Sequence, residues 1–271
     1  MRRTTPSGLV LATLSRGLRT AASIGRNIPD ALYYRLAAIN YRHRVLATEK
    51  RVRDGSFRSY ELYDRHGNDW LLAALLDRCR DGECVIDVGA NTGVYALSVA
   101  CEYSSTTVAA IEPNPIIQEI LRENVAVNGF EDRIQSFGIG LGVENASCPF
   151  YRSSYHELSS FDRVHAERWG ARVVDCVDVP VRTLDSLVEE GEIPPPDHVK
   201  IDTEGFGLEV LEGARRTIES HRPFVYVEPH RNEGESDDET AIGMWDLLVE
   251  LEYAIIPGED GWVCVPEGSH A

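Results

Sequence analysis

Short apolar segments alternate with longer amphipathic segments from residue 70 to the end of the chain. The short segments are rich in valine and isoleucine and are bounded by turn residues, as buried parallel strands are. The longer segments repeat apolar residues at the spacing of one helix face. This alternation predicts βαβ units and an α/β fold. The expected strands are residues 84–88, 107–111, 134–139, 199–201, 224–227, 253–256 and 262–265, and the expected helices are 93–102, 115–127, 184–190, 207–219 and 240–251.

The last two expected strands are connected differently from the others. Only the segment PGEDG, residues 257–261, separates them, and it is too short for a crossover helix. A short connection that contains glycine is typical of a β-hairpin. We therefore expect this pair to be antiparallel and to form one edge of an otherwise parallel sheet.

The N-terminal part of the chain has another pattern. Residues 7–26 place leucine, valine and alanine on one side of a helical wheel and arginine and serine on the other. Such a basic amphipathic helix can lie in a membrane interface, and a helix packed on the rest of the chain or an unstructured tail fits the pattern equally. Residues 30–46 predict a second helix, and the turn at Asp54 and Gly55 predicts a β-hairpin.

The charge is divided in the same way. Residues 1–58 contain twelve basic and three acidic residues, whereas residues 59–271 contain 15 basic and 41 acidic ones. Because binding to phosphates needs a basic surface, the second part is not expected to bind nucleic acid. We divide the chain into a basic N-terminal arm, residues 1–58, with helices and the start of the hairpin, and a main domain, residues 59–271.

The overall composition restricts the cellular setting. There are 44 acidic and 27 basic residues, and only two of the basic residues are lysines. An acidic surface almost without lysine indicates a salt-rich cytoplasm, where charges are screened, although a protein from a GC-rich genome has the same bias. The six cysteines have no CxxC or His/Cys ligand spacing, so we expect reduced thiols, without disulfides or a metal site. No apolar run reaches the roughly 20 residues that span a bilayer.

Polar residues and glycines gather at the carboxyl ends of the expected strands. In an open α/β sheet, ligands bind along this edge, near the point where the strand order reverses. We therefore expect the functional site here. The residues at these positions are Asp87 to Gly93, Glu112, the turn 138–142, Asp202 with Glu204, and Glu228 with His230.

The segment VIDVGANTG, residues 85–93, indicates the kind of ligand. Gly89 and Gly93 allow a tight turn close to a ligand, and the following helix directs its amide groups at it. The spacing is not GxGxxG, which disfavours a pyrophosphate-binding dehydrogenase. Asp87 on the loop strand and Glu112 at the end of the next strand fit a cofactor with an amino-acid group and a ribose. S-adenosylmethionine has both.

Six blocks of the chain resemble the FkbM-type methyltransferases, a branch of the class I S-adenosylmethionine-dependent methyltransferases. The blocks are VIDVGANTGVYAL, IEPNP, LRENVAVNG, VRTLDSL, VKIDTEGFGLEVLEGA and VYVEPH, and the resemblance covers roughly residues 60–230. It implies a Rossmann-like sheet of seven mostly parallel strands with the C-terminal antiparallel hairpin, and S-adenosylmethionine as cofactor. The resemblance places Asp87, Gly89, Asn91 and Gly93 around the methionine end, Glu112 at the ribose, and Ile139 and Gly140 near the adenine.

One block departs from the family pattern. After its Asp-x-Glu-Gly element the family usually has an aromatic residue or alanine and then a glutamate, but here Phe206 is followed by Gly207. The role of that glutamate is then either lost or taken by Glu209.

Asp202, Glu204 and His230 are the expected catalytic residues. Methyl transfer from a sulfonium is an in-line displacement, so positioning dominates, and a base is needed only for a hydroxyl acceptor. Asp202 or His230 can take that proton, and Lys200 lies on the same side of the strand as Asp202 and can pair with it. Alternatively, Glu204 with Gly205 caps the next helix, and His230 is a surface loop residue.

A carboxylate acceptor would need cations rather than a base, because it is already ionised. Residues 150–172 concentrate arginine, histidine and aromatic residues in an otherwise acidic domain, a composition that suits an acidic sugar. From this segment we expect Arg152, His156 and Arg168 to bind the acceptor. Alternatively, these arginines pair with neighbouring carboxylates on the surface.

Together with the resemblance, these features predict an O-methyltransferase that acts on a sugar or hexuronic acid. A hexuronic acid in a lipid-linked N-glycan precursor of a salt-adapted archaeon would give a methyl ester. We expect a cytoplasmic protein that contacts the inner face of the membrane through residues 7–26. A small-molecule or lipid O-methyltransferase and a non-catalytic adenosyl-binding module are the alternatives.

Overall fold

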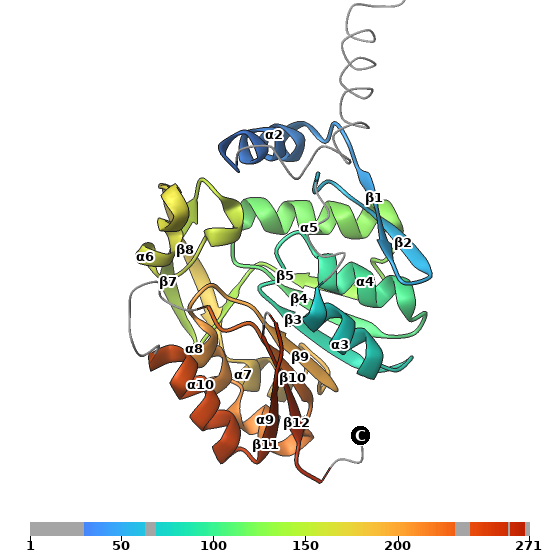
Figure 1. Cartoon of the computed structure of the whole chain (residues 1–271), viewed down its shortest axis with the longest axis vertical. Coiled ribbons are helices and arrows are strands. Elements are labelled where there is room, and N and C mark those ends of the chain that lie inside the picture. The colour runs from blue at the N-terminus through green and yellow to red at the C-terminus, as the bar shows by residue number, and fades with distance from the viewer. Residues whose placement is uncertain (1–29, 63–68, 231–238, 260, 269–271) are drawn as a thin grey trace, which may run out of the picture.

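A seven-stranded sheet forms the centre of the computed structural model, which describes residues 30–62, 69–230, 239–259 and 261–268 (Figure 1). Its strand order is β11-β12-β10-β9-β3-β4-β5. Strand β12 is antiparallel to both of its neighbours, and the other neighbouring strands are parallel. The prediction of a mostly parallel sheet with a C-terminal antiparallel hairpin is therefore confirmed. The strands are β3 (Cys84–Val88), β4 (Thr107–Ile111), β5 (Ile134–Phe137), β9 (His198–Ile201), β10 (Phe224–Val227), β11 (Tyr253–Pro257) and β12 (Trp262–Pro266).

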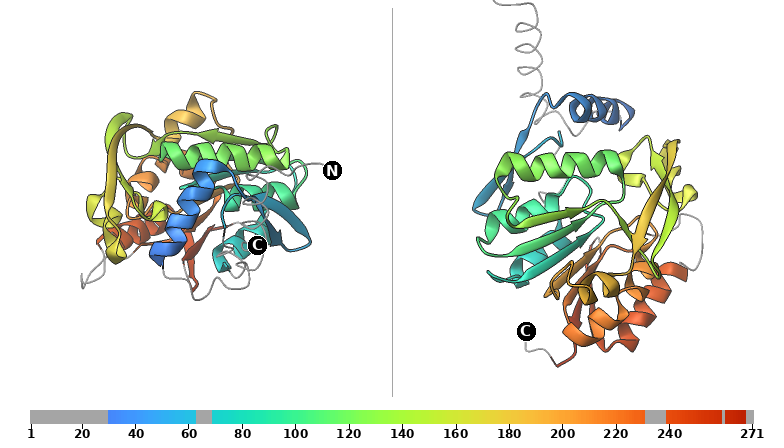
Figure 2. Two further views of the ribbon diagram at one scale, coloured as in Figure 1. Left: turned by 90° about the horizontal axis from the view of Figure 1, so that it is seen from above. Right: turned by 180° about the vertical axis from the view of Figure 1, so that it is seen from behind.

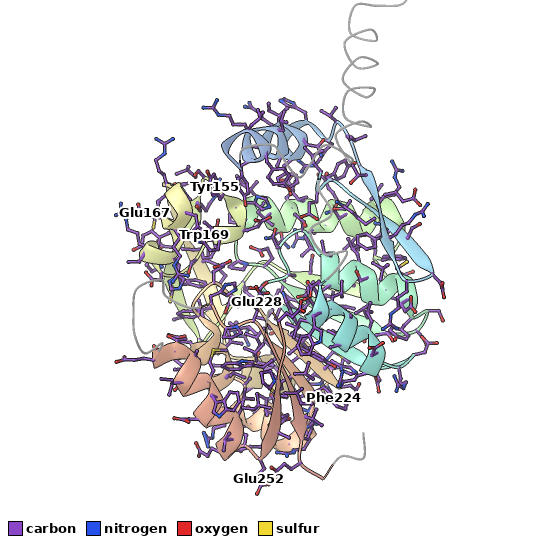
Figure 3. All side chains as sticks on the ribbon, in the orientation of Figure 1. Tyr155, Glu167, Trp169, Phe224, Glu228 and Glu252 are labelled. Atoms are coloured by element: carbon purple, nitrogen blue, oxygen red, sulfur yellow. The ribbon has the colours of Figure 1, made fainter. Side chains whose placement is uncertain are left out.

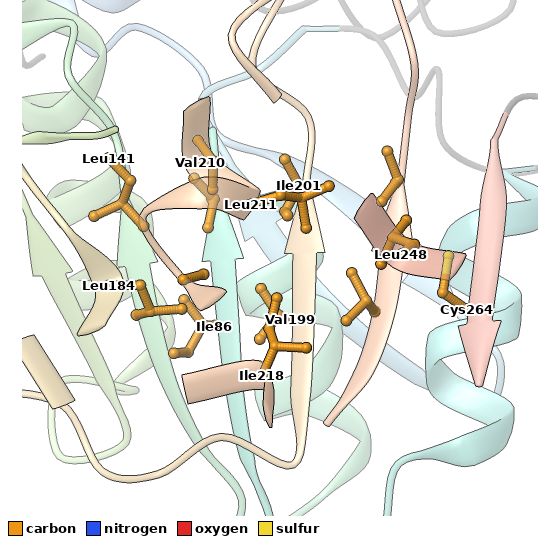
Figure 4. Packing of buried hydrophobic residues seen from close by; sticks show 14 of the residues in the cluster. Ile86, Leu141, Leu184, Val199, Ile201, Val210, Leu211, Ile218, Leu248 and Cys264 are labelled. Atoms are coloured by element: carbon orange, nitrogen blue, oxygen red, sulfur yellow. The ribbon is translucent and has the colours of Figure 1, made fainter. Parts of the chain in front are cut away.

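Helices cover both faces of this sheet. Successive residues of a strand point to opposite faces, and here the residues on both faces are buried in apolar clusters. Val85 joins the apolar cluster beneath the first three helices of the main domain, whereas the next residue, Ile86, joins the cluster beneath the later helices. Figure 4 shows the second cluster, in which Ile86 and Val199 face residues of the helices. The helices are α3 (Trp70–Arg78), α4 (Val94–Glu102) and α5 (Pro115–Asn128) on one face, and α7 (Leu184–Glu189), α8 (Gly207–Glu212), α9 (Arg215–His221) and α10 (Glu239–Glu250) on the other.

Two expected elements have different bounds in the structure. The strand expected over 134–139 ends at Phe137. The helix expected over 207–219 is divided into α8 and α9 around Gly213, where the chain passes against another backbone segment. A Cβ atom on Gly213 would lie 2.0 Å from the carbonyl oxygen of Gly142, so a long-range contact determines this break.

A second, three-stranded sheet lies beside the carboxyl end of the main sheet and was not predicted. It consists of β6 (Gly140–Leu141), β7 (Ala146–Ser153) and β8 (Val173–Arg182), in the order β6-β8-β7. Most residues of β8 are exposed or half-buried, so the sequence lacks the apolar run of a core strand. Short helical turns connect β7 to β8: η2 (His156–Leu158), α6 (Arg163–Ala166) and η3 (Arg168–Gly170).

The described part of the N-terminal arm packs on the main domain. Helix α2 (Asp30–His43) ends three residues earlier than expected, and the predicted hairpin is present as β1 (Thr48–Val52) and β2 (Gly55–Ser59). Phe57 of β2 is buried in the apolar cluster of α3 and α4, a contribution of roughly 1.5–3 kcal/mol. Figure 2 shows α2 crossing the upper end of the molecule beside α5.

The expected amphipathic helix of residues 7–26 lies outside the described residues. Within residues 30–62, 69–230, 239–259 and 261–268, the structure contains no helix whose length and apolarity would allow it to cross a bilayer.

Candidate active site

A cavity of about 230 Å³ opens where the carboxyl ends of β3, β4, β9 and β10 meet. Helix dipoles, loop amides and strand-end side chains converge at this edge of an open α/β sheet. Glu228, at the end of β10, is labelled near the centre of Figure 3. Of the expected site residues, the wall contains Gly89, Asn91, Glu112, Gly140, His156, Asp202, Glu204 and His230.

The loop from Gly89 to Gly93 forms one wall of the cavity and has a conformation that requires glycine. Gly89 has a φ of +74°, and a Cβ atom there would lie 1.7 Å from the carbonyl oxygen of Asp202. Gly93 has a φ of +91°, and a Cβ atom there would meet Leu121. Asn91 is also left-handed, with a φ of 48°, which asparagine tolerates better than most residues. The loop is therefore held close against the end of β9.

Glu112 fixes the other side of this loop. Its carboxylate accepts hydrogen bonds from the backbone amides of Asn91 at 2.9 Å and Asn114 at 2.7 Å. Burial raises the pKa of Glu112 to about 7, although the two amides act in the opposite direction. The side chain lies in the cavity wall, where its oxygens can also accept hydrogen bonds from ligand hydroxyls.

Lys200 lines the cavity and connects two carboxylates, Asp87 and Asp202. Its Nζ atom lies 3.2 Å from Oδ1 of Asp87 and 3.5 Å from Oδ2 of Asp202. Burial alone would lower the pKa of Lys200, but the charges of Asp87 and Asp202 outweigh burial and raise this pKa above its usual value. Asp87 is fully buried and lies behind the wall, so it acts through Lys200 and not by direct contact with the cavity.

His230 joins two further carboxylates at the ends of β9 and β10. Its Nε2 atom lies 2.6 Å from Oδ1 of Asp202, and its Nδ1 atom lies 3.4 Å from Oε2 of Glu204. Burial alone would lower the pKa of His230, but the bond to Asp202 and the charge of Glu204 raise it to about 9. At neutral pH the ring is therefore a cation held on both sides, and it does not act as a base.

The pKa values also change which carboxylates can act as a base. Burial alone would raise the pKa of Asp202, but Lys200 and His230 bring it below its usual range. Burial raises the pKa of Glu204 to about 7, and burial with the nearby charge of Asp202 raises that of Glu228 to about 8. Carboxylates that titrate near neutrality are suited to taking a proton. Glu204 and Glu228 therefore fit the role of base better than Asp202 or His230. We call Lys200, Asp202, Glu204, Glu228 and His230 the strand-end cluster.

Glu204 is held in a strained backbone conformation. Its φ of 46° is uncommon for a residue other than glycine. The residue before it, Thr203, has a buried hydroxyl without a hydrogen-bond partner among the described residues. Strain and unpaired polar groups concentrate at functional sites, which supports this turn as part of the site.

Two groups in the described part of the chain have ligand atoms close enough to hold a metal ion. In the first group, Asp202, Glu228 and His230, these atoms lie within 4.8 Å of one another. The ammonium group of Lys200 already neutralises Asp202 there. The second group is Cys79, Glu83 and His198, near the opposite end of the main sheet. The spacing along the sequence predicts neither group, because each is assembled from separate strands.

Aromatic rings line the apolar side of the cavity. Phe161 lies 5.0 Å from Phe150 and 4.9 Å from Phe206, measured between ring centroids. Gly140 makes this arrangement possible, since a Cβ atom there would lie 2.4 Å from the Phe161 ring. The cavity thus offers flat apolar surfaces opposite the strand-end cluster.

Several expected residues lie elsewhere. Gly93 and Ile139 are outside the cavity wall, and Ile139 packs against the core. Arg152 is paired with Asp175 at 2.8 Å and lines a different cavity, and Arg168 does not line this one. Glu209 is also absent from the wall. The wall also contains residues that were not among the expected catalytic and binding residues, including Glu61, Tyr95, Glu157, Phe161 and Glu228. Among these five residues, the sequence indicated only Glu228, because it lies at the end of a predicted strand.

The charge on His230 gives a prediction for stability. Since the folded-state pKa is raised from 6.5 to about 9, its stabilising effect is complete below pH 6.5 and is lost as the pH rises through 9. We expect His230→Gln to lower the free energy of unfolding by about 2–3 kcal/mol at pH 6, and by much less at pH 10. Urea unfolding of both proteins across this range measures the difference. An equal difference at every pH would contradict the assignment.

The strand order, the antiparallel β12 and the glycine loop after β3 define the fold as that of a class I methyltransferase. The chain belongs to the FkbM methyltransferase family, because residues 87–255 match the model of the methyltransferase FkbM domain.

Curated relatives support this membership. The hexuronic acid methyltransferase AglP of Haloferax volcanii is 30% identical over 182 residues, which are 63% of this chain and 66% of that protein. Methyltransferase 1 of Beauveria bassiana is 26% identical over 160 residues, which are 51% of this chain and 63% of that protein. The chain therefore spans somewhat less than two thirds of the length of these relatives.

Solved structures of related fold are also known. A methyltransferase FkbM from Methylobacillus flagellatus KT is 21% identical, with a TM-score of 0.47 and coverage of 70% of this chain and 45% of that chain. A methyltransferase described as S-adenosyl-L-methionine-dependent, from Methanococcus maripaludis, is 15% identical with a TM-score of 0.43, and covers 74% of this chain and 85% of that chain.

Proposed function

We propose that the protein transfers a methyl group from S-adenosylmethionine to an oxygen of a sugar, and specifically to the carboxylate of a hexuronic acid in a growing glycan. The observation that carries this proposal is the position of the strand-end cluster, which shares one cavity with the glycine loop and Glu112. Family membership and the name of the haloarchaeal relative, which gives a hexuronic acid as its substrate, support it.

The residues of the cavity fit the cofactor. Asn91 has a buried side-chain oxygen without a hydrogen-bond partner among the described residues, at the edge where an amino-acid group would lie. Glu112 would bind the ribose hydroxyls, and the backbone at Gly89 would approach the methionine end. When bound, S-adenosylmethionine supplies an electrophilic methyl group on a positively charged sulfur, which the carboxylates of the cavity would stabilise electrostatically.

A carboxylate acceptor is compatible with the cluster near neutral pH, because the raised pKa values of Glu204 and Glu228 leave these two groups partly protonated. His230 and Lys200 remain charged at this pH, and both line the cavity. An ionised carboxylate needs no base, and a cation beside it holds it for in-line displacement. Its product is a methyl ester. With a hydroxyl acceptor, Glu204 or Glu228 would take the proton, and the product would be an ether.

The proposal extends to the cellular location. The acidic composition fits a salt-rich cytoplasm, and the basic amphipathic pattern of residues 7–26 fits contact with the inner membrane face. Removal of residues 1–29 should then abolish co-sedimentation with phosphatidylglycerol vesicles. Unchanged co-sedimentation would refute the membrane contact.

Methyl transfer can be tested with S-adenosylmethionine labelled in its methyl group and lipid-linked oligosaccharides that contain hexuronic acid. We expect label in the oligosaccharide, and we expect mild base to release it, because esters hydrolyse and ethers do not. Base-stable label would refute the carboxylate acceptor. Label only in small molecules or lipids would refute the sugar, and no label in any fraction would leave a non-catalytic binding module.

A further inference from the structure

A second cavity, of about 910 Å³, runs along helix α2. Its walls come from α2, from the start of α5 and from the β7–β8 side of the molecule. In Figure 3, Tyr155 of this wall is labelled just below α2. We call this cavity the α2 groove, and its lining includes Tyr34, Arg35, Arg42, Tyr155 and Arg172.

The groove contains arginines of two kinds. Arg44 is paired with Glu119 and Glu123 on α5, and Arg152 is paired with Asp175. The side chains of Arg35, Arg42 and Arg172 have no ion pair or hydrogen bond among the described residues, and Arg42 and Arg172 are exposed. Unpaired guanidinium groups that line one groove of a strongly acidic chain indicate an anionic ligand.

The groove lies next to the candidate active site, and a wall of packed side chains separates the two cavities. The rings of Tyr34 and Tyr155 stack at 4.1 Å between centroids. The Tyr34 hydroxyl donates a 2.6 Å hydrogen bond to Glu157, which lines the first cavity together with His156. Tyr41, on the next turns of α2, packs edge-on against His156 at 5.2 Å. Only this one layer of side chains separates the cavities, so an oligosaccharide that passes over it would contact both of them.

We propose that the α2 groove binds an anionic sugar unit that neighbours the methylated one, through its carboxylate or phosphate. Arginine pairs with both groups in a planar, two-pronged geometry, and the half-buried ring of Tyr155 adds apolar surface to the same groove. This inference rests on the proposed function, because the neighbouring unit belongs to the same acceptor. Binding of this second unit would make the protein selective for an oligosaccharide over a single sugar.

Trigalacturonic acid serves as the carboxylate probe and inorganic pyrophosphate as the phosphate probe, with binding measured by calorimetry at the lowest salt that keeps the chain folded. We expect the double variant Arg42→Gln/Arg172→Gln to raise the Kd of one or both probes about 5- to 30-fold, as for the loss of two exposed charge contacts. The probe that is affected identifies the anionic group. The matched control is Arg51→Gln/Arg58→Gln, two exposed arginines of the β1–β2 hairpin, which should leave both Kd values unchanged.

The outcomes separate this inference from the proposed function. An unchanged Kd for both probes in the groove variant would overturn the inference, even if methyl transfer to glycans is observed. A loss of binding to phosphatidylglycerol vesicles without an effect on either probe would also overturn it, since the groove would then face a membrane. If the groove variant loses probe binding but the wild type methylates no sugar, the proposed function fails and the groove remains an anion site.

Discussion

Replacement of Gly89 by alanine should both destabilise the fold and abolish cofactor binding. The added Cβ atom would lie 1.7 Å from the carbonyl oxygen of Asp202, at a backbone φ of +74°. Left-handed strain and overpacking against a rigid backbone together cost about 3–5 kcal/mol. Relief of the clash requires β3 and the end of β9 to separate, which would open the wall that the cofactor contacts. Urea unfolding and calorimetric titration with S-adenosylhomocysteine measure the two effects.

Gly82→Ala is the matched control for this variant. Gly82 also has a positive φ, of +92°, but a Cβ atom there would have no neighbour within 4 Å. We expect a loss of only about 1–2 kcal/mol, from backbone strain alone, and unchanged cofactor affinity. Equal losses in the two variants would show that strain at Gly89, and not its contact with Asp202, determines the effect.

Asp202→Asn should reduce methyl transfer about 100-fold or more. The change removes the anion that holds His230 at 2.6 Å and one of the two carboxylates that neutralise Lys200. Hydrogen bonds to charged groups contribute about 1.5–3 kcal/mol each, and a loss of about 3 kcal/mol of transition-state stabilisation corresponds to more than a 100-fold change in rate. The protein should still bind S-adenosylhomocysteine, because this change leaves the proposed cofactor-binding residues Asn91 and Glu112 in place. Initial rates with labelled S-adenosylmethionine measure the effect.

Asp77→Asn provides the control, because this exposed carboxylate pairs with Arg53 of the β1–β2 turn, and neither residue lines one of the two cavities. Exposed pairs contribute little, so its rate should stay within a factor of about three. A rate for Asp202→Asn close to that of the control would exclude the strand-end cluster from the reaction.

The main sheet could be predicted because each of its strands is recognisable from its own sequence. The buried strand β10 is a continuous apolar run, β3 is apolar apart from Asp87, and the short link between β11 and β12 permits only a hairpin. The second sheet could not be predicted, because β7 and β8 stabilise each other mainly through pairing, with few buried side chains. The break at Gly213 depends on contact with Gly142, far away in the sequence.

The position of the candidate site could be predicted from the sequence, but the protonation state and role of each residue could not. The carboxyl ends of the parallel strands correctly identified Glu112, Asp202, Glu204 and His230 as residues of one cavity. The protonation states depend on burial and on pairs across strands, which are properties of the assembled site. Thus His230 becomes a cation between two carboxylates, and the unassigned Glu228 becomes a candidate base.

The basic segment of residues 150–172 contains both paired and unpaired arginines. Composition alone could not distinguish paired arginines from unpaired ones. In the structure, Arg152 is neutralised by Asp175, whereas Arg172, in the same segment, has no such partner among the described residues. The cavity therefore receives His156 from this segment and neither Arg152 nor Arg168.

A crystal structure with S-adenosylhomocysteine tests the central claim most directly, namely that cofactor and strand-end cluster share one site. We expect the ribose at Glu112, the amino-acid end against the loop from Gly89 to Gly93, and the sulfur facing Asp202, Glu204 and His230. A molecule bound elsewhere, or bound in this cavity with its sulfur directed away from the cluster, would contradict the account.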